Sequence, residues 1–308
     1  MNLFSDTNID FTGKRKIAIS ISILFIIVGI ISIVAHGGPR LGIDFLGGTL
    51  VQVKFENPVT STDVRSAISP AGYGGAVIQK FGDDKEVLIR ILEAKGDTEA
   101  AALISQALTD YFTTNPYEIR RVEKVGPKIG EELRGKAVLA ILGAMFGIVI
   151  YITFRFEFKF AIGALIALAH DVLITLGIFS LLDIEITLAV IAAFLTIVGY
   201  SLNDTIVIYD RIRENIKAMR RENYEKIVNT SINNSLARTV VTSLTTFMVV
   251  FILYIIGGEV ISGFSFAMML GVVVGTYSSI FIASPVLIEW HEWAIAKKSA
   301  DLAASSTR

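Results

Sequence analysis

The chain has 308 residues, of which 53% are hydrophobic and only 19% are charged. This composition is too apolar for an ordinary soluble domain, so we expect much of the chain to lie in a lipid bilayer. The formal net charge of -1 provides no basic surface for nucleic acid. The chain has no cysteine, and its three histidines are far apart in the sequence (His36, His170, His291), so we expect no disulfide, no metal site and no cofactor.

Six stretches reach the roughly 20 apolar residues that a helix needs to cross a bilayer. They are predicted at residues 17–35, 137–154, 160–182, 186–209, 236–256 and 262–288. The first is expected to stay as an anchor, because its apolar run is long and no A-x-A-like cleavage site follows it. The predicted fold is therefore a polytopic α-helical membrane protein with one span, a domain at 36–136, and a five-helix bundle at 137–288.

Lys and Arg residues cluster on one side of the predicted spans. They occur in the tails 1–16 and 289–308 and in the loops after the second and fourth spans, whereas the loops after the third and fifth spans have none. Such a bias marks the cytoplasmic side, so both termini are predicted to be cytoplasmic. The basic loop at 211–226 is most simply a solvated, topology-setting face, although it could also bind a cytoplasmic partner.

The long segment between the first two spans has the pattern of a small α+β domain. Strands are predicted at 49–55, 76–81, 86–92 and 117–125, with helices at 60–68 and from Asp97 to 112. This βαββαβ order is ferredoxin-like. Because the segment has no glycine-rich phosphate loop and no nucleophile elbow, we expect it to contact another molecule, the alternative being a spacer without a ligand.

The fourth predicted span carries a carboxylate within a polar stripe. Thr196, Tyr200, Asn203 and Asp204 fall within roughly a third of the helix circumference. An ionisable residue at the centre of a span costs about 2.5–3.5 kcal/mol and usually faces a bundle interior or water. We therefore interpret Asp204 as a functional group.

The fifth predicted span has a matching polar face that includes Arg238 and Thr242. If the two antiparallel spans are neighbours, Arg238 lies at a depth similar to that of Asp204, and an ion pair is expected. The proton affinity of a carboxyl in a low dielectric depends on how close a guanidinium lies, so movement of Arg238 could switch a proton relay that includes Asn203 and Thr242. The alternative is a static pair that only fixes the two helices together.

Asp171 lies near the middle of the third predicted span, next to His170. It either joins the relay or bonds hydroxyl groups of neighbouring helices. Consecutive helical residues point about 100° apart, so His170 and Asp171 need not share a face. An intramembrane enzyme is disfavoured, because the spans contain no Ser/His or Cys/His arrangement.

Several motifs follow one another in an order that matches a known family. They are Asp44-Phe-Leu-Gly47-Gly48-Thr49, Val125-Gly126-Pro127-Lys-Ile-Gly130, Ala169-His-Asp171, Gly199-Tyr-Ser-Leu-Asn203-Asp204-Thr, Asp210-Arg211-Ile-Arg213-Glu-Asn, and Arg238-Thr239 with Thr242-Ser243. Over nearly its whole length the chain resembles the SecD/SecF family of protein-export membrane proteins.

The resemblance implies half of a transporter of the resistance-nodulation-division type in the bacterial inner membrane. It implies SecD as an obligate partner, the SecYEG channel and its accessory subunits as neighbours, and an unfolded preprotein as substrate, with lipid around the spans and no nucleic acid. It places Asp204 and Arg238 on a proton path, with H⁺ as the coupling ion, and implies a transport subunit, not an enzyme. The alternative is half of a proton-driven exporter of lipids or small molecules.

Overall fold

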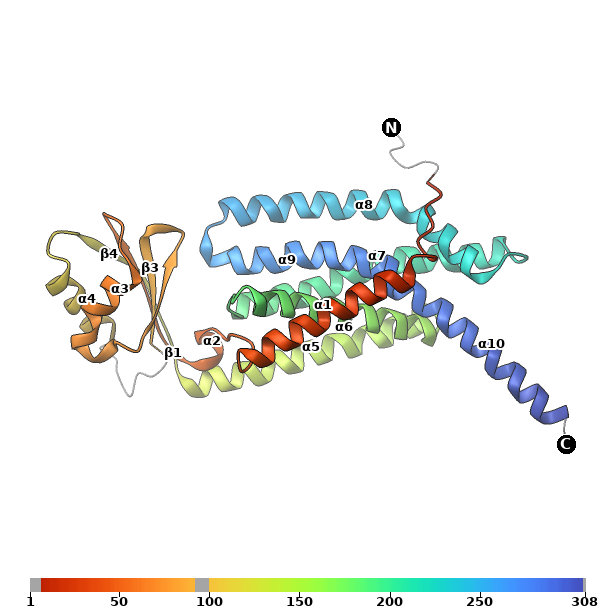
Figure 1. The fold of residues 1–308 in the computed structure, drawn as a ribbon, viewed down its shortest axis with the longest axis horizontal. Coiled ribbons are helices and arrows are strands. Elements are labelled where there is room, and N and C mark those ends of the chain that lie inside the picture. Colours follow the sequence, from red (N-terminus) through yellow and green to blue (C-terminus); the bar gives the residue numbers. More distant parts are fainter. Residues whose placement is uncertain (1–6, 92–99, 307–308) are drawn as a thin grey trace.

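The computed structural model describes residues 7–91 and 100–306. Within these residues, six helical runs are long and apolar enough to cross a membrane, as predicted. They are α1 (Arg15–Ala35), α5 (Pro127–Arg155), α6 (Phe158–Leu181), α7 (Leu188–Ala218), α8 (Tyr224–Ile256), and the run of α9 (Glu259–Ser278), η2 (Ser279–Ala283) and α10 (Ser284–Ser306). The helices form one elongated bundle with a small domain at one end and both termini at the other (Figure 1).

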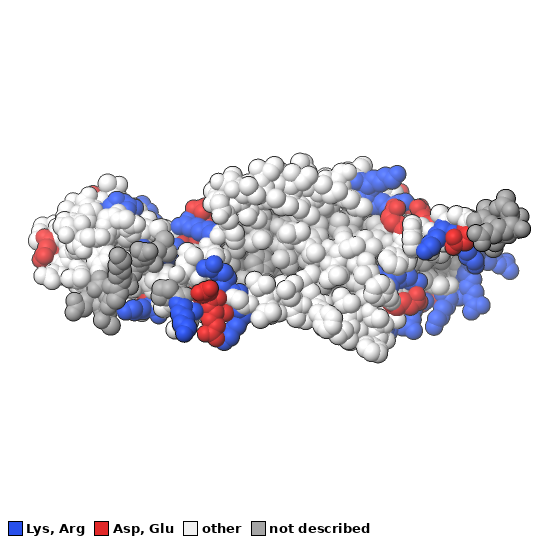
Figure 2. Space-filling model, turned by 90° about the horizontal axis from the view of Figure 1, so that it is seen from below, with Lys and Arg blue, Asp and Glu red and all other residues white. Residues whose placement is uncertain are grey.

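The surface of the bundle has the pattern of a protein embedded in lipid. On the face shown in Figure 2, charged residues gather at the two ends of the bundle, and an uncharged band lies between them. Large apolar side chains such as Phe146, Phe154 and Val249 point outward and are 67–89% exposed. A soluble protein does not expose apolar surface on this scale.

The domain contains a four-stranded antiparallel sheet with the order β2-β3-β1-β4. Its strands are β1 (Gly48–Phe55), β2 (Val77–Phe81), β3 (Asp83–Ile91) and β4 (Tyr117–Val125). The helical segments α3 (Ser61–Ile68), η1 (Ser69–Tyr73) and α4 (Ala100–Tyr111) complete the domain, and α2 (Ile43–Leu46) precedes it. The predicted ferredoxin-like order of strands and helices is confirmed.

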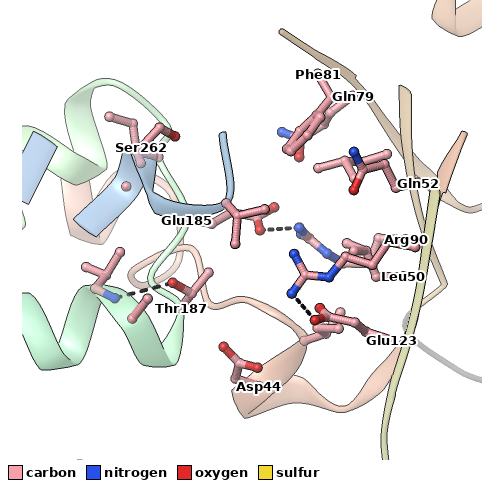
Figure 3. Close-up of a pocket in the computed structure, with 18 of the residues that line it drawn as sticks. Asp44, Leu50, Gln52, Gln79, Phe81, Arg90, Glu123, Glu185, Thr187 and Ser262 are labelled. Atoms are coloured by element: carbon pink, nitrogen blue, oxygen red, sulfur yellow. Dashed lines mark hydrogen bonds and ion pairs between the residues drawn. The ribbon is translucent and has the colours of Figure 1, made fainter. Parts of the chain in front are cut away.

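Alternation along the strands gives the sheet two different faces. Val51, Val53 and Phe55 of β1 point towards α3 and α4 and form an apolar core with residues of β3. Leu50 and Gln52 point the other way, towards the membrane bundle (Figure 3). The domain therefore has its own core and presents its helix-free face to the bundle.

The boundaries of several elements differ from the predicted ones. α5 begins at Pro127 instead of 137, and α8 begins at Tyr224 instead of 236. An apolar window detects only the part of a helix inside the hydrocarbon, whereas these helices continue through polar sequence, and Pro127 stands at a helix start, where proline is favoured. β3 begins at Asp83 because Gly82, with a φ of 76°, makes the turn from β2 tight. The helix start predicted at Asp97 lies outside the described residues.

The sixth predicted span is not one regular helix. The π-helical segment η2 interrupts it, and Ser284 Oγ donates to the Ser279 carbonyl, five residues back, at 2.8 Å. Beyond this segment α10 leaves the bundle (Figure 1). Short π-helical segments frequently occur at functional sites.

Candidate functional site

Asp204 lies where three helices of the bundle meet. Its side chain projects from α7 and the residue is only 2% exposed. Oδ2 accepts hydrogen bonds from Ser243 Oγ of α8 at 3.1 Å and from Thr276 Oγ1 of α9 at 3.4 Å. The two hydroxyls are also 2.6 Å from each other. Ser243 and Thr276 line a groove of about 330 Å³ between α8 and α9, so the partners of this carboxyl reach an open surface.

The ion pair predicted between Asp204 and Arg238 is not formed. Among the ion pairs of the described residues, none joins these two side chains, and Arg238 is exposed on the outer side of α8. Thr242, one turn further along α8, donates from Oγ1 to the Arg238 carbonyl at 2.9 Å. Hydroxyl groups from α8 and α9 occupy the positions nearest the carboxyl. Arg238 and Asp204 therefore do not touch, although they were predicted to lie at a similar depth in the membrane. Asn203 lies on the exposed side of α7.

Asp171 is the centre of a second polar cluster and is fully buried. Oδ2 accepts from Ser201 Oγ of α7 at 2.6 Å and from Ser278 Oγ of α9 at 2.9 Å. Oδ1 lies 2.9 Å from Nδ1 of His170. Asp171 thus bonds hydroxyls of neighbouring helices, which was one of its two predicted roles, and the adjacent His170 does reach it. Its membership of a proton relay stays a prediction.

The second cluster continues to α1. His170 Nε2 lies 3.0 Å from Ser22 Oγ, which is 3.0 Å from the Tyr277 hydroxyl of α9. Tyr277 in turn donates to the Ala18 carbonyl at 2.7 Å. Tyr277 lies in a run of hydroxyl residues from Thr276 to Ser279 in an otherwise apolar span, a signal that the sequence does contain, whereas Ser22 has no comparable signal.

The two clusters lie on a tightly packed interface between α7 and α9. A Cβ at Gly275 would be 2.8 Å from Cβ of Ser201, and one at Gly271 would be 2.2 Å from Cγ1 of Ile197. Only glycine lets the two backbones approach this closely, as in small-xxx-small helix contacts. Gly143 and Gly147 of α5 have the same spacing but face open space.

The Asp44–Thr49 motif joins the domain to the bundle. Asp44 Oδ2 accepts from the Leu188 amide at 2.7 Å, at the first residue of the helix that carries Asp204. The φ angles of Gly47 and Gly48 are 75° and 128°, which favour glycine, and Thr49 then enters β1 opposite Ile91 of β3.

The second glycine motif holds α5 against the same junction. Gly126 is the N-cap of α5 and Pro127 is its first residue. A Cβ at Gly130 would be 2.9 Å from the Phe45 carbonyl, which also accepts from Arg134 Nη2 at 3.0 Å. The two motifs therefore pack against each other where the chain enters and leaves the domain.

The motif from Asp210 to Arg213 lies at the opposite end of the bundle. Asp210 Oδ1 accepts from Arg155 Nη2 at 3.0 Å, and Arg213 Nη1 donates to the Arg155 carbonyl at 3.4 Å. Arg211 pairs with Glu214 on its own helix. These contacts fasten α7 to the end of α5, a packing role.

Comparison with known proteins identifies the family. The family described as "Protein export membrane protein SecD/SecF, C-terminal" matches residues 104–293, and the "SecD/SecF GG Motif" matches residues 33–59. The chain belongs to the SecD/SecF family. The GG motif of this family coincides with the junction between domain and bundle, and the longer match contains both carboxylates, Asp171 and Asp204.

Curated members of the SecD/SecF family match the chain over most of its length. "Protein translocase subunit SecF" of Magnetococcus marinus is 48% identical over 286 residues, which cover 92% of this chain and 92% of that protein. The protein of the same name from Vibrio alginolyticus is 44% identical over 290 residues, covering 93% of this chain and 91% of that protein. These relatives disfavour the alternative of a lipid or small-molecule exporter.

Solved structures of SecDF share the fold. The structure of SecDF from Thermus, a translocon-associated membrane protein, matches with a TM-score of 0.87 and 37% identity over 95% of this chain. SecDF in a super-membrane-facing form matches with a TM-score of 0.72 and 36% identity over 97% of this chain. The chain spans 40% and 41% of the lengths of those two chains.

Proposed function

We propose that this chain pairs with SecD and uses the proton motive force to help complete the export of unfolded preproteins across the bacterial inner membrane, beside the SecYEG channel. Asp204 carries the proposal. It is a buried carboxyl in a spanning helix, and its direct hydrogen-bond partners in the described part of the chain are hydroxyls next to an open groove. Ionisable groups inside a membrane commonly serve proton relays in transporters.

The outer polar face of α7 and α8 supports an obligate membrane partner. Arg238, Asn203 and Thr245 are exposed there in the single chain. An arginine in contact with lipid at the centre of a span costs about 2.5–3.5 kcal/mol. We therefore expect a helix of a partner protein, with polar groups of its own, to pack against this face. This chain covers only 40% of the SecDF chain that it matches. We propose that the rest of SecDF, the SecD part, corresponds to this partner.

The positions of the termini and the domain support the proposed orientation. The termini lie at the end of the bundle opposite the domain (Figure 1), and that end carries Arg155, Arg211 and the basic residues around Lys217. Basic residues favour the cytoplasmic side. We therefore place both termini in the cytoplasm and the domain outside, where it can meet an emerging preprotein.

Proton binding at Asp204 would change which groups its neighbours can bond. The ionised carboxyl accepts from Ser243 and Thr276 together, whereas the protonated form has its own O–H to donate and attracts Arg238 less. A neutral carboxyl is a weaker acceptor than a carboxylate, so protonation weakens the bonds from Ser243 and Thr276 and loosens α7 from α8 and α9. Such a change in helix packing is the step that we expect to drive movement of the domain, and no cofactor or enzymatic reaction is required.

The replacement of Asp204 by asparagine tests this function. Asp204→Asn keeps the side-chain shape but cannot ionise, so the protein should still assemble with SecD while stimulation of export by a proton gradient is lost. The measurement is preprotein transport into vesicles with and without the gradient, and Asp301→Asn on exposed α10 is the matched control. Undiminished stimulation in Asp204→Asn would contradict the proposal. Lipid and drug efflux assayed on the same strains would reveal the exporter alternative.

A further inference from the structure

The loop between α6 and α7 connects the membrane carboxylates to the domain. It joins the helix that carries Asp171 to the helix that carries Asp204. The Ile186 amide donates to the Arg40 carbonyl at 2.7 Å, and the Gly42 amide donates to the Ile186 carbonyl at 2.9 Å. The loop is therefore fixed to the segment that leads from α1 into the domain, and a shift of α6 or α7 must move this segment.

Glu185 is the centre of the contacts that this loop makes with the domain. It forms an ion pair with Arg90 of β3 (Figure 3). Its Oε1 also lies 3.4 Å from Nε of Arg40. The side chains of Arg90 and Glu185 are only 6% and 15% exposed. With its amide oriented to satisfy both neighbours, Gln79 of β2 donates to Glu185 Oε1 at 3.3 Å and accepts from Arg40 Nη2 at 2.7 Å.

Away from Glu185, the domain and the bundle are separated by a cleft and do not form a packed core. A cleft of about 530 Å³ separates the helix-free face of the sheet from the bundle, and Glu185 and Arg90 meet across it (Figure 3). Leu50, Gln52 and Arg121 line it on the domain side, and Asp44 and Thr187 line it on the bundle side. The apolar core of the domain lies on the other face of the sheet, so this contact can open without unfolding the domain.

We propose that Glu185 and Arg90 form a latch that transmits movement of α6 and α7 to the domain. The latch rests on the proposed function, because it assigns the route by which the membrane carboxylates act on the domain. With the latch closed, the sheet is held over the bundle; when the α6–α7 loop shifts, Glu185 leaves Arg90 and the domain is released. Arg40 lies 3.4 Å from Glu185 and is bonded to the same loop through its backbone, so the carboxylate keeps a partner when it leaves Arg90 and the latch can have two discrete states.

A double-mutant cycle measures the coupling between Glu185 and Arg90. Glu185→Gln and Arg90→Gln should each lower gradient-stimulated export about five-fold or more, the lower end of typical coupling between sites, while ATP-driven export without a gradient is unchanged. The double variant should lose no more than either single variant, because the two residues act through each other. Asp84→Asn is the matched control, since it breaks an ion pair with Lys80 that stays within the domain. Wild-type stimulation in both single variants, or additive losses, would overturn the latch.

A distance measurement separates the latch from a merely structural contact. The chain has no cysteine, so spin labels at Asp110→Cys of α4 and Ile256→Cys at the end of α8 report the position of the domain in the complex with SecD. Asp204→Asn should shift this distance, and Glu185→Gln should abolish the shift. A shift that persists in Glu185→Gln, or no shift at all, would contradict the latch. Absence of gradient stimulation in the unmodified complex would instead contradict the proposed function.

Discussion

The bundle contains two buried carboxylates whose surroundings differ. Asp171 is enclosed, with two hydroxyls at 2.6 and 2.9 Å and a histidine at 2.9 Å. Asp204 has two hydroxyls at 3.1 and 3.4 Å, and these line an open groove. We therefore interpret Asp171, with short bonds to several helices, as an anchor, and we propose that Asp204, with longer bonds to hydroxyls that line a groove, is the carboxyl that exchanges a proton.

This difference shows that a charge in a span does not by itself define a relay. Both residues are costly to bury, and both are compensated by side chains on α9. We expect the role of each carboxyl to depend on how many hydrogen-bond donors surround it and on whether its partners reach the surface of the bundle. We therefore expect substitutions at Asp171 to affect mainly stability, and substitutions at Asp204 to affect mainly transport.

The largest loss of stability is expected for Asp171→Ala. The change leaves the hydroxyls of Ser201 and Ser278 and the ring of His170 without their acceptor in a dry interior. At about 0.6–1.7 kcal/mol for each of the three bonds inside a membrane protein, the free energy of unfolding should fall by about 2–5 kcal/mol. Unfolding of the detergent-solubilised complex by titration with SDS measures the loss. An equal or larger loss in Asp204→Ala would remove the distinction between the two sites.

An intermediate effect is expected where the two clusters meet. Gly275→Val places side-chain atoms against Ser201, where even a Cβ would be 2.8 Å away, and overpacking costs about 1–3 kcal/mol. The same substitution at Gly147 of α5 faces open space in this chain and is the matched control. Both variants are compared by SDS unfolding of the complex. A large loss at Gly147 would instead indicate that a partner helix packs there.

The smallest effect distinguishes single hydrogen bonds of the two clusters. Thr276→Val removes the 3.4 Å bond to Asp204 and the 2.6 Å contact with Ser243, and at about 0.6 kcal/mol for an average bond it should lower the free energy of unfolding by about 1 kcal/mol. Ser278→Ala, which removes the 2.9 Å bond to Asp171, should cost more, up to about 1.7 kcal/mol. The same unfolding assay compares them. A larger loss of stability in Thr276→Val than in Ser278→Ala would contradict the difference between the two sites, because Asp204 would then be the more tightly bonded carboxyl.

Much of this arrangement could be predicted from the sequence. Apolar length predicted the six spans, strand alternation predicted the ferredoxin-like order, and the polar stripe on the fourth span singled out Asp204. These features depend on periodicity within one element. The capping of α3 by Thr60, where both halves of a capping box with Asp63 form, is of the same kind.

Contacts between elements could not be predicted in the same way. Ser22 and Ser278 are ordinary residues for an apolar helix, and only the packing of α1 and α9 brings them to His170 and Asp171. The positions of Asp204 and Arg238 along their helices predicted a similar depth in the membrane, but they could not show that hydroxyls lie nearer to Asp204 than Arg238 does. The latch likewise joins residues 95 positions apart, Arg90 and Glu185, without a local pattern.

Infrared difference spectroscopy on acidification tests most directly the claim that Asp204, and not Asp171, exchanges the proton. The complex with SecD is compared in three forms: unmodified, Asp171→Asn and Asp204→Asn. The account predicts that the C=O band of a newly protonated carboxyl appears in the unmodified complex and in Asp171→Asn, and is absent from Asp204→Asn. Persistence of that band in Asp204→Asn together with its loss in Asp171→Asn would contradict the account.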